Sequence, residues 1–167
     1  MTDPDPPIDG VDAHIVSVLL GDGRASFRAI SDRVGVSPTT VSERVRRLQR
    51  LGVIEGFEPR VDHTKLGYGT VAAFRIRAAT GARGRLAAGV TEYRSMVSVF
   101  EVAGRYDVLA IGRFPGADAV RTCARELRDR ASVDEVSTTL VLDDVLPYRQ
   151  LGSPDELVDG PRSRRPD

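Results

Sequence analysis

DGRASFRAISDRVGVSPTTVSERVRRLQRLGVIEGFEPRVD, residues 22–62, is the stretch that decides the fold of the N-terminal part of this chain. Ser26 can cap a first helix, and Gly35 stands where a left-handed residue commonly ends one. Ser37 followed by Pro38 is a strong start signal for a second helix, because the serine side chain can cap it and proline fits its first turn. The stretch therefore predicts two helices joined by a tight turn.

The second helix of this pair has an apolar side and a basic side. Its apolar positions, Val41, Val45 and Leu48, repeat at intervals of four and three residues, which is helical spacing. Between Arg24 and Arg50 there are seven arginines and two acidic residues, whereas the whole chain balances 24 basic against 24 acidic residues. Charge concentrated on one segment of a neutral chain marks a docking surface. A basic helix supported by a second helix is the arrangement that binds in the major groove of double-stranded DNA.

The polar side of this unit supplies candidate DNA contacts. The predicted residues are Arg24, Arg28, Ser37, Thr39, Thr40, Glu43, Arg44 and Arg47. We expect those from Thr39 to Arg44 to approach base edges, and Arg47 to contact phosphate. Ser37 lies at a helix N-terminus, where backbone N–H groups favour phosphate, and Arg24 and Arg28 would contact the DNA backbone. The alternative for every arginine is a solvated position on an exposed helix face.

The flanking residues complete the predicted N-terminal domain. Apolar residues near helical spacing predict another helix from Asp9 to Leu20, with Gly21 just past its end. After the basic helix, Val53–Glu55 and Phe57–Val61 predict a short hairpin, or wing. We therefore expect a winged helix-turn-helix domain over residues 8–61.

The periodicity changes after a predicted linker at residues 62–69. Over residues 70–79, apolar Phe74 and Ile76 alternate with Arg75 and Arg77, the pattern of a strand with one wet face. The segments predicted beyond it are helices at 83–93 and 116–130 and strands at 97–103, 108–114 and 136–142. The order βαββαβ is that of a ferredoxin-like domain, in which both helices cover one face of an antiparallel four-stranded sheet. The sequence therefore predicts an α+β chain whose second domain spans residues 70–146.

Several short motifs stand in a fixed order along the two predicted domains. They include Asp9-x-x-Asp12, Asp22-Gly-Arg24, Val36-Ser37-x-x-Thr40-Val41, Arg44-Val45-x-Arg47-Leu48, Gly52-Val53-Ile54-x-Gly56, Leu66-Gly67-Tyr68 and Gly104-x-Tyr106-Asp107. Each motif is weak alone, but together they resemble the Lrp/AsnC family, the feast/famine transcriptional regulators, from about Ile8 to Leu146. The resemblance implies a sequence-specific DNA-binding regulator with a ferredoxin-like (RAM/ACT-like) second domain. It also implies homodimers formed through that domain, with tetramers or octamers as larger assemblies.

An effector site is predicted near the turn between the second and third strands. Many members of the family bind a free amino acid between neighbouring sheet domains near this turn, so the resemblance implies the same small-molecule partner here. Gly104 permits close approach of a ligand, Asp107 can receive an ammonium group, and Tyr106 belongs to the same motif. Ser137 and Thr139 are candidate donors to a carboxylate. Taken alone, the segment favours a plain hairpin connection with Asp107 capping its own backbone; the resemblance favours the site.

Two other functions compete with that of an effector-controlled regulator. Sirohaem decarboxylases resemble these regulators and work with histidines in the sheet half, but this chain has no histidine after His63. We therefore expect no enzymatic activity. An effector-free architectural protein would instead compact DNA, and its binding would depend steeply on salt and hardly on sequence.

The remaining composition argues against other kinds of site. The single cysteine, Cys123, excludes an internal disulfide and lies on the apolar stripe of its predicted helix, while neither His14 nor His63 has partners at metal-ligand spacing. We expect no metal and no cofactor beyond an amino acid effector. No apolar stretch approaches the ~20 residues of a membrane span and no signal-peptide pattern is present, so we expect a cytoplasmic location. Residues 147–167 are rich in Pro, Gly and charge and are expected to be a disordered tail.

Overall fold

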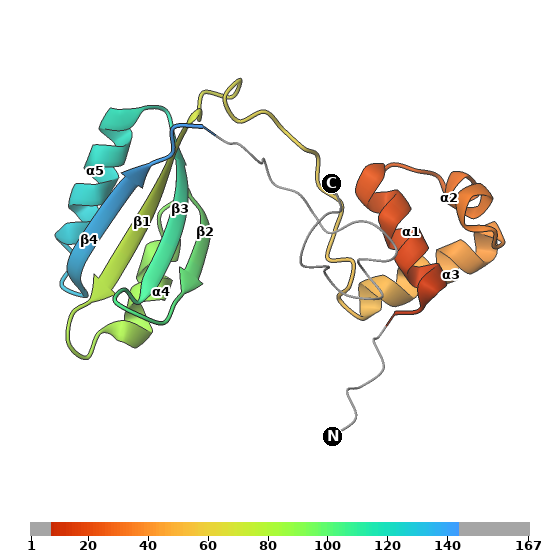
Figure 1. Cartoon of the computed structure of the whole chain (residues 1–167), viewed down its shortest axis with the longest axis horizontal. Coiled ribbons are helices and arrows are strands. Elements are labelled where there is room, and N and C mark those ends of the chain that lie inside the picture. The colour runs from red at the N-terminus through yellow and green to blue at the C-terminus, as the bar shows by residue number, and fades with distance from the viewer. Residues whose placement is uncertain (1–7, 144–167) are drawn as a thin grey trace, which may run out of the picture. The chain divides into compact units, whose positions relative to one another are not determined.

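The computed structural model describes residues 8–143, which divide between Arg60 and Val61 into two compact units. The first unit contains α1 (Gly10–Gly21), α2 (Phe27–Val34) and α3 (Pro38–Arg50). The second contains β1 (Thr70–Ala78), α4 (Arg83–Thr91), β2 (Met96–Glu101), β3 (Val108–Phe114), α5 (Ala117–Arg128) and β4 (Val133–Leu140) (Figure 1). Between residues 8 and 143, no helix combines the length and the apolar content that crossing a bilayer requires. The predicted tail at 147–167 lies outside the described residues.

The helices of the first unit begin where the sequence places their caps. The hydroxyl of Ser26 accepts from the N–H of Ala29 at 3.1 Å, and that of Ser37 accepts from the N–H of Thr40 at 3.0 Å. Gly35 ends α2 with a φ of 80°, a left-handed conformation that favours glycine. The helices enclose a buried core made of Ile15, Ile30, Val41, Val45 and Leu48. These contacts confirm the predicted helix-turn-helix.

The predicted wing is wrong. Residues 53–61 belong to the described chain and form no strand. The N–H groups of Val53 and Ile54 instead donate to the carbonyl of Leu48 at 2.9 and 3.2 Å, so they close the end of α3. Pro59 has no N–H to offer to a strand ladder. The two segments that suggested a hairpin therefore form a helix end and an exposed connection.

The segment predicted as a linker contains a closed turn. The carboxylate of Asp62 accepts from the N–H groups of Thr64 and Lys65 at 3.0 and 3.3 Å. The N–H of Tyr68 donates to the carbonyl of His63 at 2.8 Å. These bonds bring the two ends of the turn together immediately before β1.

The second unit is the predicted ferredoxin-like fold. Its sheet has the strand order β2-β3-β1-β4, and each neighbouring pair is antiparallel. In the register, Phe74 of β1 lies opposite Ala110 of β3 and Thr138 of β4. The last strand begins at Val133, three residues earlier than predicted, because Val133 pairs with Ala78 across an irregularity in β1.

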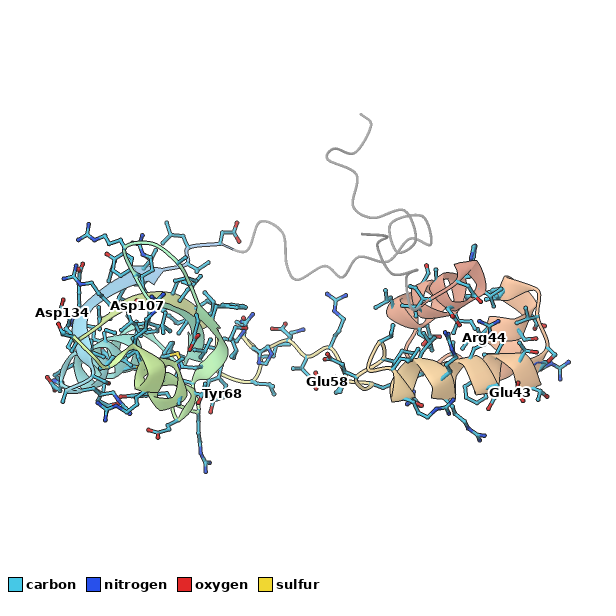
Figure 2. All side chains as sticks on the ribbon, turned by 90° about the horizontal axis from the view of Figure 1, so that it is seen from below. Glu43, Arg44, Glu58, Tyr68, Asp107 and Asp134 are labelled. Atoms are coloured by element: carbon cyan, nitrogen blue, oxygen red, sulfur yellow. The ribbon has the colours of Figure 1, made fainter. Side chains whose placement is uncertain are left out.

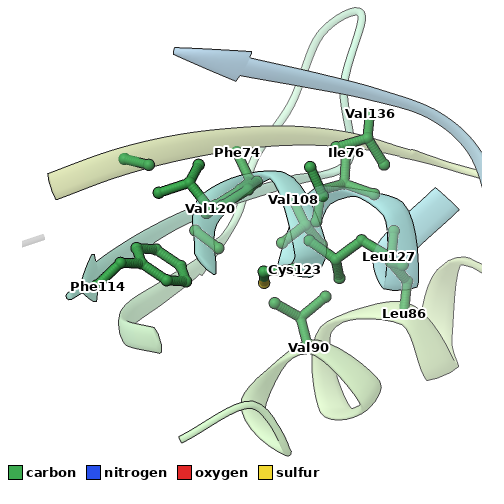
Figure 3. Packing of buried hydrophobic residues seen from close by; sticks show 13 residues of the cluster. Phe74, Ile76, Leu86, Val90, Val108, Phe114, Val120, Cys123, Leu127 and Val136 are labelled. Carbon is green, nitrogen blue, oxygen red and sulfur yellow. The ribbon is translucent and has the colours of Figure 1, made fainter. Parts of the chain in front are cut away.

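Both helices of this unit pack on one face of the sheet. Figure 3 shows Leu86 and Val90 of α4 and Leu127 of α5 meeting Phe74 and Ile76 of β1. The opposite face carries the alternate residues of the strands. Arginines of β1 lie there beside Leu109 and Ile111 of β3, which are only partly covered.

Cys123 is a core residue, as its position on the helix predicts. Only 5% of it is exposed, and burial raises the pKa of its thiol to about 11. The thiol therefore remains protonated and neutral at ordinary pH. A nucleophilic role is not supported by this environment.

Candidate DNA-binding helix and effector turn

One stripe of α3 is open to solvent. It consists of Thr39, Glu43, Arg46 and Arg50, which are spaced at intervals of four, three and four residues. The opposite side of the helix is buried against α1 and α2. At the N-terminal end the hydroxyls of Ser37 and Thr40 lie 2.8 Å apart, so both take part in the cap. This stripe is a continuous polar surface beside a capped helix start.

Arg44 and Arg47 lie on the side of α3 that faces α1. Guanidinium nitrogens of Arg44 and Arg47 approach the carboxylate of Asp12 at 3.2 and 2.8 Å, and Arg44 also pairs with Asp9. The side chain of Asp12 is fully buried. Figure 2 shows Arg44 directed into the helical unit, whereas Glu43 leaves the other side of α3. The two arginines thus fasten α3 to the start of α1.

The acidic partners are themselves fixed by the start of α1. Asp9 and Asp12 form a reciprocal capping box, in which each carboxylate accepts from the other residue's N–H. The hydrogen bond from the N–H of Asp12, and then the Arg44 guanidinium, lower the pKa of the Asp9 carboxyl. The hydrogen bond to Asp9 in turn raises the pKa of Arg44. The four residues form what we call the α1–α3 clamp: Asp9, Asp12, Arg44 and Arg47.

The clamp corrects one part of the sequence interpretation. The sequence predicts that Arg44 approaches base edges and that Arg47 contacts phosphate, whereas in the structure both guanidinium groups are engaged with α1. The Asp9-x-x-Asp12 motif opposite the equally spaced Arg44 and Arg47 was the available signal. Arg46, which the prediction omitted from its contacts, is exposed and has no ion pair among residues 8–143.

The predicted backbone contacts lie at the entrance to α2. Arg28 is in its first turn and Arg24 precedes its cap, and both are exposed. The N–H of Arg24 donates to the carboxylate of Asp22 at 3.0 Å, which shapes the loop before the helix. Whether these arginines touch DNA stays a prediction, but both are accessible.

Asp107 holds the β2–β3 turn to the end of β1. One carboxylate oxygen accepts from the N–H of Ala78 at 2.9 Å, and the other lies 3.1 Å from the guanidinium of Arg83. The N–H of Asp107 donates to the carbonyl of Ile76 at 2.9 Å. Gly104 in the same turn has a φ of 128°, which other residues rarely adopt. Asp107 is thus a structural anchor with a charged partner near the surface.

Tyr106 and Ser137 are brought together by an arginine that the sequence interpretation left out. The guanidinium of Arg75 lies over the Tyr106 ring, 5.4 Å from its centre, and donates to the hydroxyl of Ser137 at 3.0 Å. The Tyr106 hydroxyl donates to Glu135 at 3.1 Å. Arg105 covers the same ring at 5.5 Å. Alternation in β1 places Arg75 on the wet face and was the signal that could have found it.

Thr139 stands apart from this group. It lies two residues beyond Ser137 along β4, opposite Ala73 of β1, and is exposed. The structure therefore gathers four of the five predicted effector residues around the β2–β3 turn and the middle of β4. It adds Arg75, Arg83 and Glu135 to their surroundings.

Comparison with known proteins matches each of the two units to a known domain family. Residues 8–49 match the AsnC-type helix-turn-helix domain, and residues 71–151 match the Lrp/AsnC ligand binding domain. The transcriptional regulator AldR of Mycobacterium tuberculosis is 31% identical over 140 residues, which cover 81% of this chain and 78% of the relative. The regulator FL11 of Pyrococcus horikoshii is 29% identical over 136 residues, covering 81% and 90% of the two chains.

A solved structure has the same fold over most of the chain. The transcriptional regulator NMB0573 of Neisseria meningitidis, in complex with L-Met, superposes with a TM-score of 0.80 at 24% identity and covers 86% of this chain and 96% of that one. The helix-turn-helix with its open α3 stripe, the ferredoxin-like sheet and the sequence matches in both units all indicate the same family. The chain belongs to the Lrp/AsnC family of transcriptional regulators.

Proposed function

We propose that this regulator recognises specific DNA sites through the open stripe of α3 and that an amino acid bound at the β2–β3 turn modulates its binding. The stripe carries the first part of the proposal, because it is the side of α3 that the described residues of the unit leave uncovered. Thr39 and Glu43 stand near the capped N-terminus, where a helix enters the major groove. Arg46 and Arg50 extend the stripe with positive charge that suits guanine edges or phosphates.

The effector part of the proposal rests on a pair of opposite charges at the β2–β3 turn, those of Arg83 and Asp107. The Arg83 side chain is 68% exposed and the Asp107 side chain 19% exposed, so a ligand can reach the pair from solvent. A free amino acid offers a carboxylate to the arginine and an ammonium to the aspartate, which satisfies both charges at once. The match of residues 71–151 to a ligand-binding domain supports this assignment.

We also infer a homodimer formed through the uncovered face of the sheet. That face presents Leu109, Ile111 and the half-exposed Phe100 together. Removing such an apolar patch from water lowers the free energy, and two copies related by a twofold axis can cover each other's patch. Such a dimer would present two α3 helices, one to each of two adjacent half-sites in the DNA.

A binding experiment separates this function from architectural DNA compaction. Purified full-length protein is incubated with fragmented genomic DNA, with and without a mixture of amino acids, and the retained fragments are sequenced. We expect a few enriched sites of dyad-like symmetry whose enrichment changes with the amino acids. Uniform retention of all fragments, with only a steep dependence on salt, would instead favour the architectural alternative.

Replacing Asp107 with asparagine should remove the response to amino acids while leaving the fold intact. The amide keeps an oxygen that can accept from the N–H of Ala78, but it loses the charge that faces Arg83 and the ligand's ammonium. Thermal unfolding with each amino acid should show a stabilising ligand for the natural chain and none for Asp107→Asn. Asp118→Asn is the matched control, since Asp118 is an exposed aspartate that pairs with Arg121 on α5, beyond the other end of β3. An equal response in all three proteins contradicts the site.

No observation favours an enzyme. A decarboxylase of related architecture needs histidines in its sheet half, and the sequence holds none beyond His63. Among residues 8–143, the groups gathered at the turn are arginines, carboxylates, a tyrosine and a serine that are already bound to one another. We therefore assign no catalytic residue.

A further inference from the structure

Glu43 is the acidic member of the open stripe of α3. Its charged neighbours on the stripe, Arg46 and Arg50, are cations, and Thr39 is neutral. All four side chains are exposed. Figure 2 shows Glu43 leaving α3 on the side opposite to Arg44. The surface proposed for DNA therefore carries a carboxylate, a group that the phosphates of DNA repel.

The α1–α3 clamp leaves this carboxylate without a cationic partner. A glutamate commonly pairs with an arginine four residues further along the same helix. Arg47 occupies that position, but its guanidinium lies 2.8 Å from Asp12 of α1. In the part of the chain that the structure describes, neither Glu43 nor Arg46, three residues after it, has an ion pair or a side-chain hydrogen bond. The oxygens of Glu43 thus point to solvent with their capacity to accept hydrogen bonds unused by the protein.

An unpaired carboxylate in this position weakens the attraction to DNA of arbitrary sequence. Binding to the DNA backbone comes from cations that replace the counterions of the phosphates, and a negative charge among those cations opposes it. The carboxylate also loses water when it enters the groove, which costs free energy unless a donor replaces that water. Glu43 should therefore penalise every sequence that offers no hydrogen-bond donor opposite it.

The donors on base edges in the major groove are exocyclic amino groups. Cytosine presents its N4 amino group, whereas adenine presents N6 beside the acceptor N7. Guanine and thymine present acceptors instead. A carboxylate has acceptors only, so N7 of adenine would face one of its oxygens unfavourably. The chemistry of Glu43 therefore favours cytosine.

Glu43 also lies at a suitable depth along α3. It stands about 7.5 Å along the helix axis from Pro38, because each residue adds roughly 1.5 Å, so it belongs to the N-terminal half that reaches base edges in a helix-turn-helix. Arg46 lies about 4.5 Å further, close to the ~3.4 Å between stacked base pairs. The two residues can therefore contact neighbouring base pairs, and the base that suits an arginine is guanine.

Given the proposed docking of α3 in the major groove, we propose that Glu43 is a specificity-determining residue that accepts a hydrogen bond from the N4 amino group of a cytosine. The same carboxylate lowers the affinity for sequences with another base at that position. Affinity for the correct site comes from the cations of the stripe, and discrimination against other sites comes from Glu43.

The base preference of two variants tests the proposal. Glu43→Gln keeps the length of the side chain but gains a donor, which suits N6 and N7 of adenine. Full-length proteins are equilibrated with duplexes in which each position of the selected site is randomised in turn, and the bound DNA is sequenced. The natural chain should prefer cytosine at one position by about tenfold. Glu43→Gln should prefer adenine there, and Glu43→Ala should have no preference.

Affinity for a scrambled duplex should change in the opposite direction. Both variants lose the negative charge, so they should bind scrambled DNA at least about twofold more tightly at low salt. Glu126→Gln is the matched control, because it removes the same charge from an exposed position of α5 that has no ion pair among the described residues. It should change neither the base preference nor the affinity for scrambled DNA.

The outcomes separate this role from DNA binding by α3. An unchanged preference at every position in both Glu43 variants overturns the proposal and leaves the DNA-binding function in place. A preference that depends on Glu43 but selects another base overturns the assignment to cytosine. An equal gain on scrambled DNA in Glu126→Gln overturns the local penalty. Equal binding of selected and scrambled DNA by the natural chain would instead overturn the proposed function itself.

Discussion

Replacing Asp12 with alanine is expected to cost the N-terminal unit about 1.5–3 kcal/mol of folding free energy, because a buried carboxylate that accepts from two partly exposed arginines is lost. The side chain of Asp12 is fully buried, and the guanidinium groups of Arg44 and Arg47 both donate to it. Without it, Arg47 loses this carboxylate, and Arg44 keeps Asp9 but loses Asp12. The capping interaction with the N–H of Asp9 is lost as well. A single core of this size rarely supplies more than ~3–5 kcal/mol of stability, so the loss is a large fraction of the total.

Hydrogen exchange of the full-length protein checks this expectation. Amides of α1 and α3 should exchange much faster in Asp12→Ala, while amides of the sheet unit should keep their protection. Asp32→Ala is the control, because Asp32 is an exposed aspartate of α2 without an ion pair among the described residues. A loss below about 1 kcal/mol in Asp12→Ala, the level of an exposed pair, would show that the clamp does not carry the unit.

The second large effect is expected from removing positive charge on the open stripe. The double variant Arg46→Ala/Arg50→Ala should bind its selected DNA site at least about tenfold more weakly, because a lost base or phosphate contact costs ~1–3 kcal/mol. If both arginines contact phosphate, the slope of log affinity against log salt should fall by about 1.8, since each phosphate contributes roughly 0.9. Gel-shift titrations at several salt concentrations measure both quantities.

Two controls separate groove contact from other effects of charge. Arg128→Ala removes a cation from the exposed side of α5 and should leave DNA affinity unchanged. Arg44→Ala should lower the stability of the helical unit, because Arg44 belongs to the clamp. Full affinity and an unchanged salt slope in the double variant would refute docking through the stripe.

Local signals in the sequence predicted most of the helical unit. The Ser26 and Ser37 caps, Pro38 at the first position of α3 and the left-handed Gly35 act within a few residues of each other, so they can be recognised without tertiary information. The prediction of a hairpin was wrong because the residues Val53 and Ile54 fit two structures, a strand or the end of α3. Only the contact with Leu48 in the folded chain decides between them.

The sites depend on contacts between distant residues, and there the sequence was less informative. Helical periodicity places Arg44 on the flank of α3, but the choice between solvent, DNA and Asp12 depends on how α1 packs. Likewise, Asp107 could cap its own turn or anchor another strand. Its partners, Ala78 and Arg83, lie more than twenty positions away in the chain, so the turn's own sequence does not reveal them.

The division of α3 into a fastened side and a free side has an evolutionary consequence. Substitutions at Thr39, Glu43 or Arg46 should be able to change the operator, because they leave the contacts of Asp12 with its two arginines untouched. Selection for a DNA target and selection for a stable fold then act on different positions of the same helix. Grafting another family member's residues onto those outward positions should accordingly redirect this repressor or activator without any compensating change elsewhere.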